Sequence, residues 1–396
     1  MTAAPKVDRR HGTVPPWRDI RVLRVVAQVG ILLAVGLGVA YLVNNLSTGM
    51  AERGFSFSFG FLDRRAGFEI GESPVPYSAD DTYGQAFLVG LLNTLFVSVV
   101  GIVLATVLGI VIGVARLSPN WLVRRTAAGY VELIRNTPLL LQLFVIFFVV
   151  LLQLPPVRET IALPGWVFLN QRGLFVPGPQ VSSGFGLWVV LLGVGLAAAI
   201  VGRIASRRLA EHGRPEYRLG LVGPLVLVAL AVGGWVLPAE PPMTFDLPVR
   251  GRFNFSGGLA LSSSFTALLT GLVIYTAAFI AEIVRGGIQA VRHGQVEAAR
   301  ALGFSEGDTL RLIVFPQALR VVVPPLTSQY LNLTKNSSLA IAVGYPDLFK
   351  IGTTTANQTG QPVPVILLVM GTYLAISLAT SLLMNLYNRR VQVLER

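Results

Sequence analysis

The chain has 396 residues, of which 53% are apolar and only 13% are charged. Long uncharged runs with this composition indicate an integral membrane protein. The net charge of +12 does not indicate nucleic-acid binding, because the basic residues flank apolar runs and form no aromatic and basic RNA- or DNA-binding module. The chain has no cysteine, which excludes disulfides, thiolate metal sites and thiol catalysis. Its three histidines lie outside every apolar run, which excludes histidine proton relays within a membrane.

Eight apolar segments are long enough to cross a hydrocarbon core of roughly 30 Å, which needs about 20 helical residues. The sequence therefore predicts an all-α membrane protein. Lys and Arg gather in the amino-terminal tail, in alternate loops and at the carboxy terminus, so both termini are expected in the cytoplasm. The first segment has no clear small-residue cleavage site after it and is expected to be a retained anchor. The expected spans are residues 22–44, 85–115, 128–154, 185–202, 219–237, 259–284, 318–345 and 363–388.

The first external loop, residues 46–84, has aromatic residues at every second position from Phe55 to Phe61. Acidic residues follow, from Glu69 to Asp81. Alternation with a period of two predicts a short extended segment, which would lie on the outer membrane face. Two interpretations are open: a landing surface for a soluble partner, or an ordered lid without a specific role.

A short amphipathic stretch, residues 297–316, separates the sixth and seventh expected spans. Gly303 can adopt the left-handed conformation that ends a helix. Ser305 can cap the next helix, with Asp308 at its third position. We therefore expect a sharp turn and a restarted helix, which Pro316 should separate from the following span.

The first helix of this stretch is suited to docking. Ala298 and Ala299 would let another surface approach closely, and Glu297 offers a charge at the edge. The alternative is that the stretch only connects two spans.

The spacing of this stretch resembles the EAA loop of ABC importer permeases. The matching positions are Glu297, Ala298, Ala299, Gly303, Ile313 and Pro316, with Phe315 in place of a leucine. The chain is similar to the permease subunits of polar amino acid ABC importers, the histidine, glutamine and arginine group. Within that group it most resembles the larger permeases of general L-amino acid systems. The further matching stretches are residues 90–94, 130–138, 281–289, 316–320 and 335–340.

The resemblance implies the transmembrane domain of a type I ABC importer, with three parts. Residues 1–84 would hold a cytoplasmic tail, an added helix and a periplasmic loop. Residues 85–388 would form the permease domain, with an inserted helix pair at about 185–237 and the coupling loop at about 285–320. Residues 389–396 would be a second cytoplasmic tail.

The resemblance also implies a multi-pass protein of the bacterial inner membrane that imports L-amino acids by alternating access. The chain has no Gly-Lys-Ser/Thr phosphate loop, so it is expected to be no enzyme and to carry no cofactor. Separate ATPase subunits would dock on the coupling loop and bind ATP and Mg. A homologous permease, usually a different one, a periplasmic amino acid binding protein and membrane lipid complete the expected partners.

Two charged pairs lie near the cytoplasmic ends of expected spans. Glu132 and Arg135 are three residues apart on one helix, and Glu282 and Arg285 repeat the spacing on another. Each pair can close across one helical turn. One hypothesis is that the pairs exchange partners as a cytoplasmic gate. The alternative is that each is an ordinary pair at a helix end, with side chains that reach the interface.

Lys335 falls in the middle of the seventh expected span, which also contains Pro324 and Pro325. Two prolines and a polar run predict an interrupted helix. Broken helices at the membrane midplane commonly form solute sites. Alternatively, Lys335 reaches an interface and the polar run binds a neighbouring helix. The residues expected to line an amino acid pathway are Asn93, Thr94, Asn332, Lys335, Asn336, Ser337 and Ser338.

Asn136 and Asn336 depart from the family pattern, since many relatives have Gly and Asp at these positions. Without the acid at 336, a possible ion pair with Lys335 is absent. Among other functions, an ion-driven secondary transporter would need carboxylates within the membrane or an inverted repeat. Glu132 and Glu282 lie too near the surface for that role, and no such repeat is recognisable. A membrane enzyme is not supported either, because no catalytic cluster converges on one place.

Overall fold

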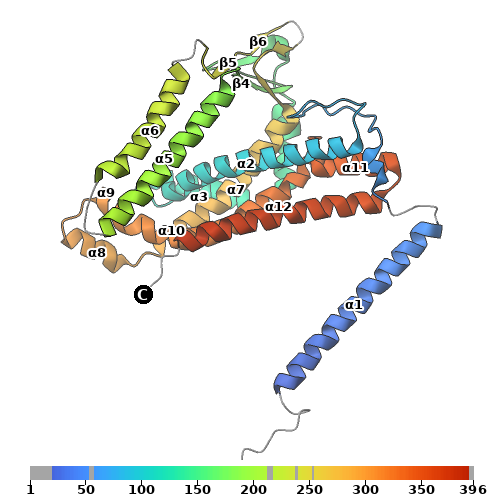
Figure 1. Ribbon diagram of the computed structural model, residues 1–396, viewed down its shortest axis with the longest axis horizontal. Helices are drawn as coiled ribbons and strands as arrows, with labels where there is room; N and C mark the ends of the chain where they lie inside the picture. Colours follow the sequence, from blue (N-terminus) through green and yellow to red (C-terminus); the bar gives the residue numbers. More distant parts are fainter. Residues whose placement is uncertain (1–19, 53–57, 212–216, 237–239, 252–253, 392–396) are drawn as a thin grey trace, which may run out of the picture.

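The computed structural model describes residues 20–52, 58–211, 217–236, 240–251 and 254–391. The described chain is mainly helical, with long helices packed lengthwise (Figure 1). Its α-helices are α1 (Ile20–Glu52), α2 (Tyr83–Ala115), α3 (Trp121–Arg135), α4 (Leu139–Phe144), α5 (Phe185–Glu211), α6 (Tyr217–Val236), α7 (Ser263–Gln289), α8 (His293–Ala301), α9 (Glu306–Asp308), α10 (Phe315–Asn336), α11 (Leu348–Thr359) and α12 (Pro362–Val391).

Six of the described helical stretches are long and apolar enough to cross a membrane. They correspond to the first, second, fourth, sixth, seventh and eighth expected spans. A bent pair of helices, Trp121–Arg135 and Leu139–Leu151, replaces the third expected span and would raise the number to seven. The fifth expected span coincides with α6, whose apolar part is the shorter stretch Leu221–Val236. These findings confirm a multi-pass helical protein, whereas the expected number of eight spans is not confirmed.

The core forms where α2 packs against α7 along a stripe of small residues. Gly101, Ala105, Gly109 and Gly113 recur every fourth position of α2 and therefore share one face. A side-chain carbon at Gly109 would lie only 2.6 Å from Ile280. Ala277 and Ala281 of α7 are fully buried, so both helices present small residues at the contact. Small residues let two backbones approach closely, which is a common way to pack helices in a membrane.

The prediction of one continuous span over residues 128–154 is wrong, because the chain bends by 104° between α3 and α4. Thr137 precedes Pro138, and a residue before proline is disfavoured in helical conformation. Gln142 partly compensates for the break, since its Nε2 donates to the carbonyls of Ile134 at 2.9 Å and Thr137 at 3.0 Å. After α4 the helix continues as a π-helix, Val145–Leu151.

The described residues include eight short strands, here called the strand cap, which the sequence analysis did not predict; β4, β5 and β6 are labelled at the top of Figure 1. Strands β1, β2, β3 and β8 form a sheet in that order, and β4 pairs with β5 and β6 with β7, all antiparallel. The strand bounds are β1 Ile161–Leu163, β2 Val167–Asn170, β3 Gly173–Val176, β4 Gly178–Val181, β5 Met243–Asp246, β6 Val249–Arg250, β7 Phe255–Ser256 and β8 Leu259–Ser262.

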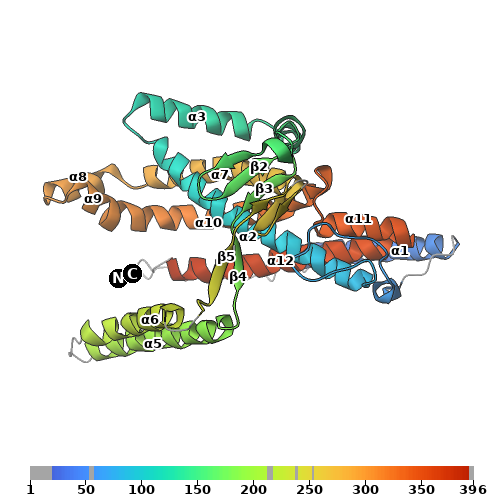
Figure 2. The same cartoon turned by 90° about the horizontal axis from the view of Figure 1, so that it is seen from above.

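The helix pair expected at about 185–237 forms a hairpin of α5 and α6, which stands beside the main bundle (Figure 2). An added side-chain carbon at Gly195 would lie 2.8 Å from Leu227, and one at Gly223 would lie 2.5 Å from Ala199. Trp188 donates its indole N–H to the carbonyl of Ala231 at 3.0 Å. The two helices therefore pack closely against each other. Strand β4 leads into the hairpin and strand β5, paired with β4, follows it.

The helix α1 lies apart from the rest of the described chain (Figure 1), and its apolar span has no buried residues. The prediction of an extended segment in the first external loop is wrong for Gly60–Asp63, which form a 3-10 helix with Phe61 buried. Phe55 and Phe57 lie outside the described residues. Phe61, Ala66 and Ile70 pack into a second core cluster with the beginning of α2 and with α11.

Candidate functional site

The helices α8 and α9 and the π-helix Thr309–Val314 form a helical turn, here called the elbow, at the left end of Figure 1. Gly303 has a φ of +82°, as its predicted role at the end of a helix requires. The Ser305 hydroxyl accepts a hydrogen bond from the backbone N–H of Asp308 at 3.1 Å, as predicted for a helix cap. The local chemistry of the sequence therefore accounts for the turn.

The first helix of the elbow has one inward and one outward face. Ala299 is buried, whereas Ala298 and Glu297 are exposed. A Glu297 carboxylate oxygen lies 2.9 Å from Nδ1 of His293, one turn earlier. Leu302 next to the turn is 78% exposed, so the elbow presents apolar and small side chains to its surroundings.

The prediction that Pro316 separates the elbow from the next span is wrong. The chain stays helical from Glu306 to Ala342. Phe315 donates its N–H to the carbonyl of Leu310, five residues back, in the wider hydrogen-bond pattern of a π-helix. Pro316 lies at the beginning of α10, where its missing N–H is tolerated most easily. The elbow is therefore joined to the bundle by an unbroken helix.

The prediction of an interrupted helix at Pro324 and Pro325 is also wrong, since α10 is continuous through both prolines. The change comes later, at Ser337, where a 3-10 helix runs to Ala342. The hydroxyl of Ser337 donates to the carbonyl of Thr334 at 2.7 Å, and that of Ser338 donates to the carbonyl of Lys335 at 2.8 Å. These bonds satisfy carbonyls at the end of α10, where the helical hydrogen-bond ladder changes.

The structure does not bring together the seven residues expected along a pathway. Lys335 and Ser338 line an open groove of about 630 Å³ whose other walls belong to α11 and α12. Asn93 and Thr94 are buried elsewhere and already hydrogen-bonded. The amide of Asn93 donates to the carbonyls of Glu72 and Pro346, both at 2.9 Å, and Thr94 accepts from the backbone of Leu348 at 3.0 Å. Asn332 is exposed and Asn336 is half-buried, and neither lines the groove.

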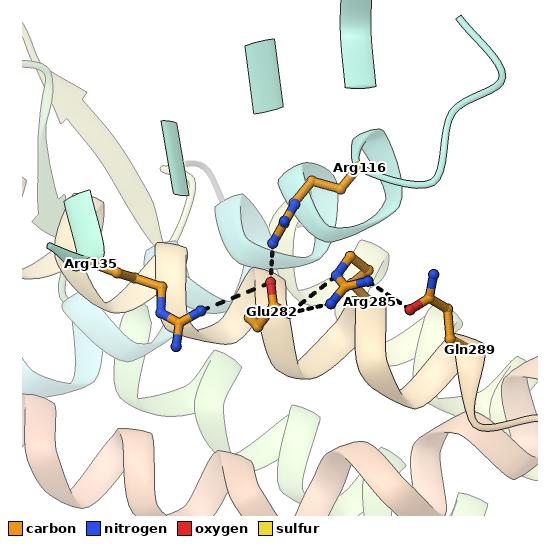
Figure 3. A network of polar contacts seen from close by, with 5 residues as sticks. All are labelled: Arg116, Arg135, Glu282, Arg285 and Gln289. Atoms are coloured by element: carbon orange, nitrogen blue, oxygen red, sulfur yellow. Dashed lines mark hydrogen bonds and ion pairs between the residues drawn. The ribbon is translucent and has the colours of Figure 1, made fainter. Parts of the chain in front are cut away.

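The two charged pairs do not each close on themselves. Glu282 of α7 accepts hydrogen bonds from Arg116 and Arg285, and Arg135 of α3 approaches the same carboxylate at 4.0 Å (Figure 3). Arg135 also lies over the ring of Phe279, 5.1 Å from its centre. The predicted pair Glu282 and Arg285 is therefore present, whereas Arg135 faces Glu282 rather than Glu132.

Glu132 lines the same small cavity, of about 360 Å³, as Arg116, Arg135 and Glu282. No ion pair of Glu132 occurs among the described residues. Arg116 is the member that sequence reasoning missed, because it counted only as a basic residue beside a span. Its place directly after α2 and the small-residue stripe that joins α2 to α7 were the available signals.

Comparison with known proteins identifies relatives over nearly the whole chain. The putative amino-acid ABC transporter permease protein YhdX of Escherichia coli is 45% identical over 97% of this chain and 96% of the relative. The general L-amino acid transport system permease protein AapQ of Rhizobium johnstonii is 44% identical, over 96% and 94%. The glutamate/glutamine/aspartate/asparagine transport system permease protein BztB of Rhodobacter capsulatus is 43% identical, over 96% of each chain.

The family model for the binding-protein-dependent transport system inner membrane component matches residues 105–393. The match begins within α2 and includes the arginine and glutamate cluster, the elbow and the groove beside Lys335. These features, several apolar helices and the full-length relatives agree with one another. The chain belongs to the binding-protein-dependent transport system inner membrane component family and is a multi-pass protein of the inner membrane.

Proposed function

We propose that this chain is the permease subunit of an ATP-driven importer that moves L-amino acids from the outside into the cytoplasm. The relatives named above are all amino acid permeases. The observation that carries the coupling part of the proposal is the elbow. Its first helix exposes Ala298 and Glu297, the left-handed Gly303 fixes the turn, and an unbroken helix leads from there into the bundle.

In this proposal an ATPase subunit, which binds ATP and Mg, docks on the elbow and supplies the energy for transport. Small side chains at the docking helix let the ATPase surface approach closely, and the continuous helix that follows transmits its movement. The resulting change of the bundle would expose a pathway first to one side of the membrane and then to the other. The groove beside Lys335 is our candidate for that pathway, because a lysine in an apolar wall attracts carboxylates.

We further propose that the charged cluster on Glu282 acts as a gate on the cytoplasmic side. Arg116 and Arg285 hydrogen-bond the carboxylate, whereas Arg135 is the most distant of the three cations at 4.0 Å. Glu132 lines the same cavity one turn from Arg135 and offers a second acceptor. An exchange of Arg135 between the two acids would accompany opening. If so, Glu132→Gln slows transport without loss of assembly, and equal transport by this variant and wild type would contradict the exchange.

The complete importer in this proposal contains a second, homologous permease, ATPase subunits and an external amino acid binding protein. The exposed apolar surface of α3, with Trp121 62% and Leu133 68% exposed, is compatible with contact to lipid or to the second permease. Selectivity for particular amino acids would then reside largely in the external binding protein.

The decisive test is reconstitution of the assembled transporter in vesicles, with ATP inside and a labelled amino acid outside. Ala298→Arg places a large charged side chain on the docking face and should abolish ATP-driven uptake and weaken co-purification of the ATPase. Ala298→Ser is the matched control, because it keeps a small side chain at the same exposed position. Uptake by the isolated chain that is driven by a proton or sodium gradient, with Ala298→Arg as active as wild type, would refute the proposal in favour of secondary transport.

A further inference from the structure

A cavity of about 520 Å³ lies between the strand cap and the first external loop. Its walls come from segments that are distant in the sequence: the loop at Glu72, Asn93 and Phe96 within α2, the beginning of α7, and strands β4, β5 and β8. The helix α7 begins directly after strand β8 of the cap and ends shortly before α8 of the elbow, so the cap and the elbow lie at opposite ends of α7. The cavity therefore lies at the end of α7 opposite the proposed ATPase contact.

Three aromatic side chains form a row along this cavity. Phe96 stacks on Phe265 with ring centres 5.6 Å apart, and Phe265 packs against Tyr345 at 5.4 Å. Phe265 and Tyr345 are buried, and Phe96 is 45% exposed at the open end of the row. Aromatic faces of this kind favour aliphatic stems and cationic groups.

Two carboxyl groups line the same cavity, one from the first external loop and one from strand β5. Glu72 accepts a hydrogen bond from the hydroxyl of Ser262, and Asp246 accepts one from the backbone N–H of Gly258 at 2.9 Å. Neither has an ion-pair partner in the part of the chain that the structure describes. Burial raises the pKa of Glu72, and the bond from Ser262 lowers it in part. A partly buried carboxylate without a cation is stabilised by any cation that reaches it.

The charge of the lining distinguishes between possible occupants. Among the described residues no Lys or Arg lines the cavity, so none of them would neutralise the carboxylate of a free amino acid there. A basic side chain on a protein backbone carries no such carboxylate. Its aliphatic stem would pack on the aromatic row while its cation meets Glu72.

We propose that this cavity is a docking pocket for a basic side chain, Lys or Arg, of the external binding protein. The inference rests on the proposed function, since it assigns a contact point to the binding protein expected there. Three residues carry it: Glu72 in the loop, Asp246 in the cap and Phe96 at the rim. The strand cap and the loop thereby form one receiving surface.

The first test measures ligand binding to the purified chain by saturation-transfer NMR. The probes are Nα-acetyl-L-arginine methylamide, its neutral citrulline analogue and free L-arginine. The arginine methylamide should bind to wild type, and Glu72→Gln should weaken it on the order of tenfold, which is about 1.4 kcal/mol. Glu69→Gln, which removes an exposed carboxylate from the same loop, is the matched control and should bind like wild type. The proposed pocket would be overturned if the arginine methylamide did not bind, or if it bound Glu72→Gln and Glu69→Gln equally. It would also be overturned if free L-arginine bound equally well and in a way that depended on Glu72.

The second test uses the assembled transporter and its binding protein. Glu72→Gln should raise the binding-protein concentration needed for half-maximal ATPase stimulation on the order of tenfold, and Glu69→Gln should not. If Glu72→Gln needed the same binding-protein concentration as wild type, the docking role would be overturned. ATP-driven uptake, and with it the proposed function, would be unaffected by that result. Failure of ATP-driven uptake in wild type would instead remove the proposed function, and the probe measurement would still decide whether the pocket takes a basic side chain.

Discussion

The contact between α2 and α7 leads to a quantitative prediction for Gly109→Ala. The added carbon would lie 2.6 Å from Ile280 and 3.0 Å from the carbonyl of Ala277. Carbon atoms in contact are normally about 3.5–4.0 Å apart, so the helices must separate by about 1 Å. Overpacking of this kind costs about 1–3 kcal/mol. Replacing a helical glycine by alanine stabilises the helix by about 1 kcal/mol, so the net loss of stability is up to about 2 kcal/mol.

The assay is thermal unfolding of the purified protein in one detergent. The melting temperature changes by about 2–4 °C per kcal/mol for chains of 150–250 residues and by less for longer ones. Gly109→Ala should therefore lower it by a few degrees. Gly101→Ala is the matched control on the same helix face, because its new carbon would meet only the ends of leucine side chains, of Leu333 at 3.3 Å and of Leu269 at 3.8 Å. Equal melting temperatures for the two variants would refute the view that the small-residue stripe sets the helix separation.

Two further predictions concern buried charges. Glu282→Gln leaves Arg116 and Arg285 without their carboxylate, and their side chains are only 15% and 29% exposed. The variant should therefore lose about 1–3 kcal/mol of stability in the same melting assay. Glu132→Gln is the control, and an equal loss of stability in both variants would contradict the pairing. Burial raises the pKa of Asp347, in the loop before α11, to about 6. Since the folded state keeps this proton when the unfolded state has lost it, stability should fall as pH rises from about 4 to about 6. Asp347→Asn should remove that component, and an unchanged pH profile would refute it.

Local chemistry explains which parts of the candidate site were predictable from the sequence. The turn at Gly303 and the cap at Ser305 depend on backbone conformation and on a hydrogen bond to a neighbour, so the residues themselves determine them. The same local reasoning gave a wrong prediction at Pro316, where it expected the helix to end. The π-helix before Pro316 widens the hydrogen-bond pattern, so the helix can pass from Val314 into α10 through a residue that has no N–H.

Features that depend on contacts between residues distant in the sequence were harder to predict from it. The long apolar helices follow from hydropathy, whereas the break at Pro138 lies beside polar residues that the span prediction included, Arg135, Asn136 and Thr137. A short polar run does not by itself report a bend of 104°. The convergence of Arg116 and Arg135 on Glu282 joins residues up to 166 positions apart, and no local pattern reports it. The strand cap was also missed, because its strands are at most four residues long and too short for a clear alternation.

The helix that runs unbroken from Glu306 to Ala342 is 37 residues long. At 1.5 Å per residue it spans about 55 Å, longer than the hydrocarbon core of a bilayer. It connects the elbow to the segment around Lys335 through one continuous series of helical turns, which includes a π-helix and two prolines. In the proposed function, a rotation imposed on its Glu306 end would be carried along this helix toward Lys335 near its other end.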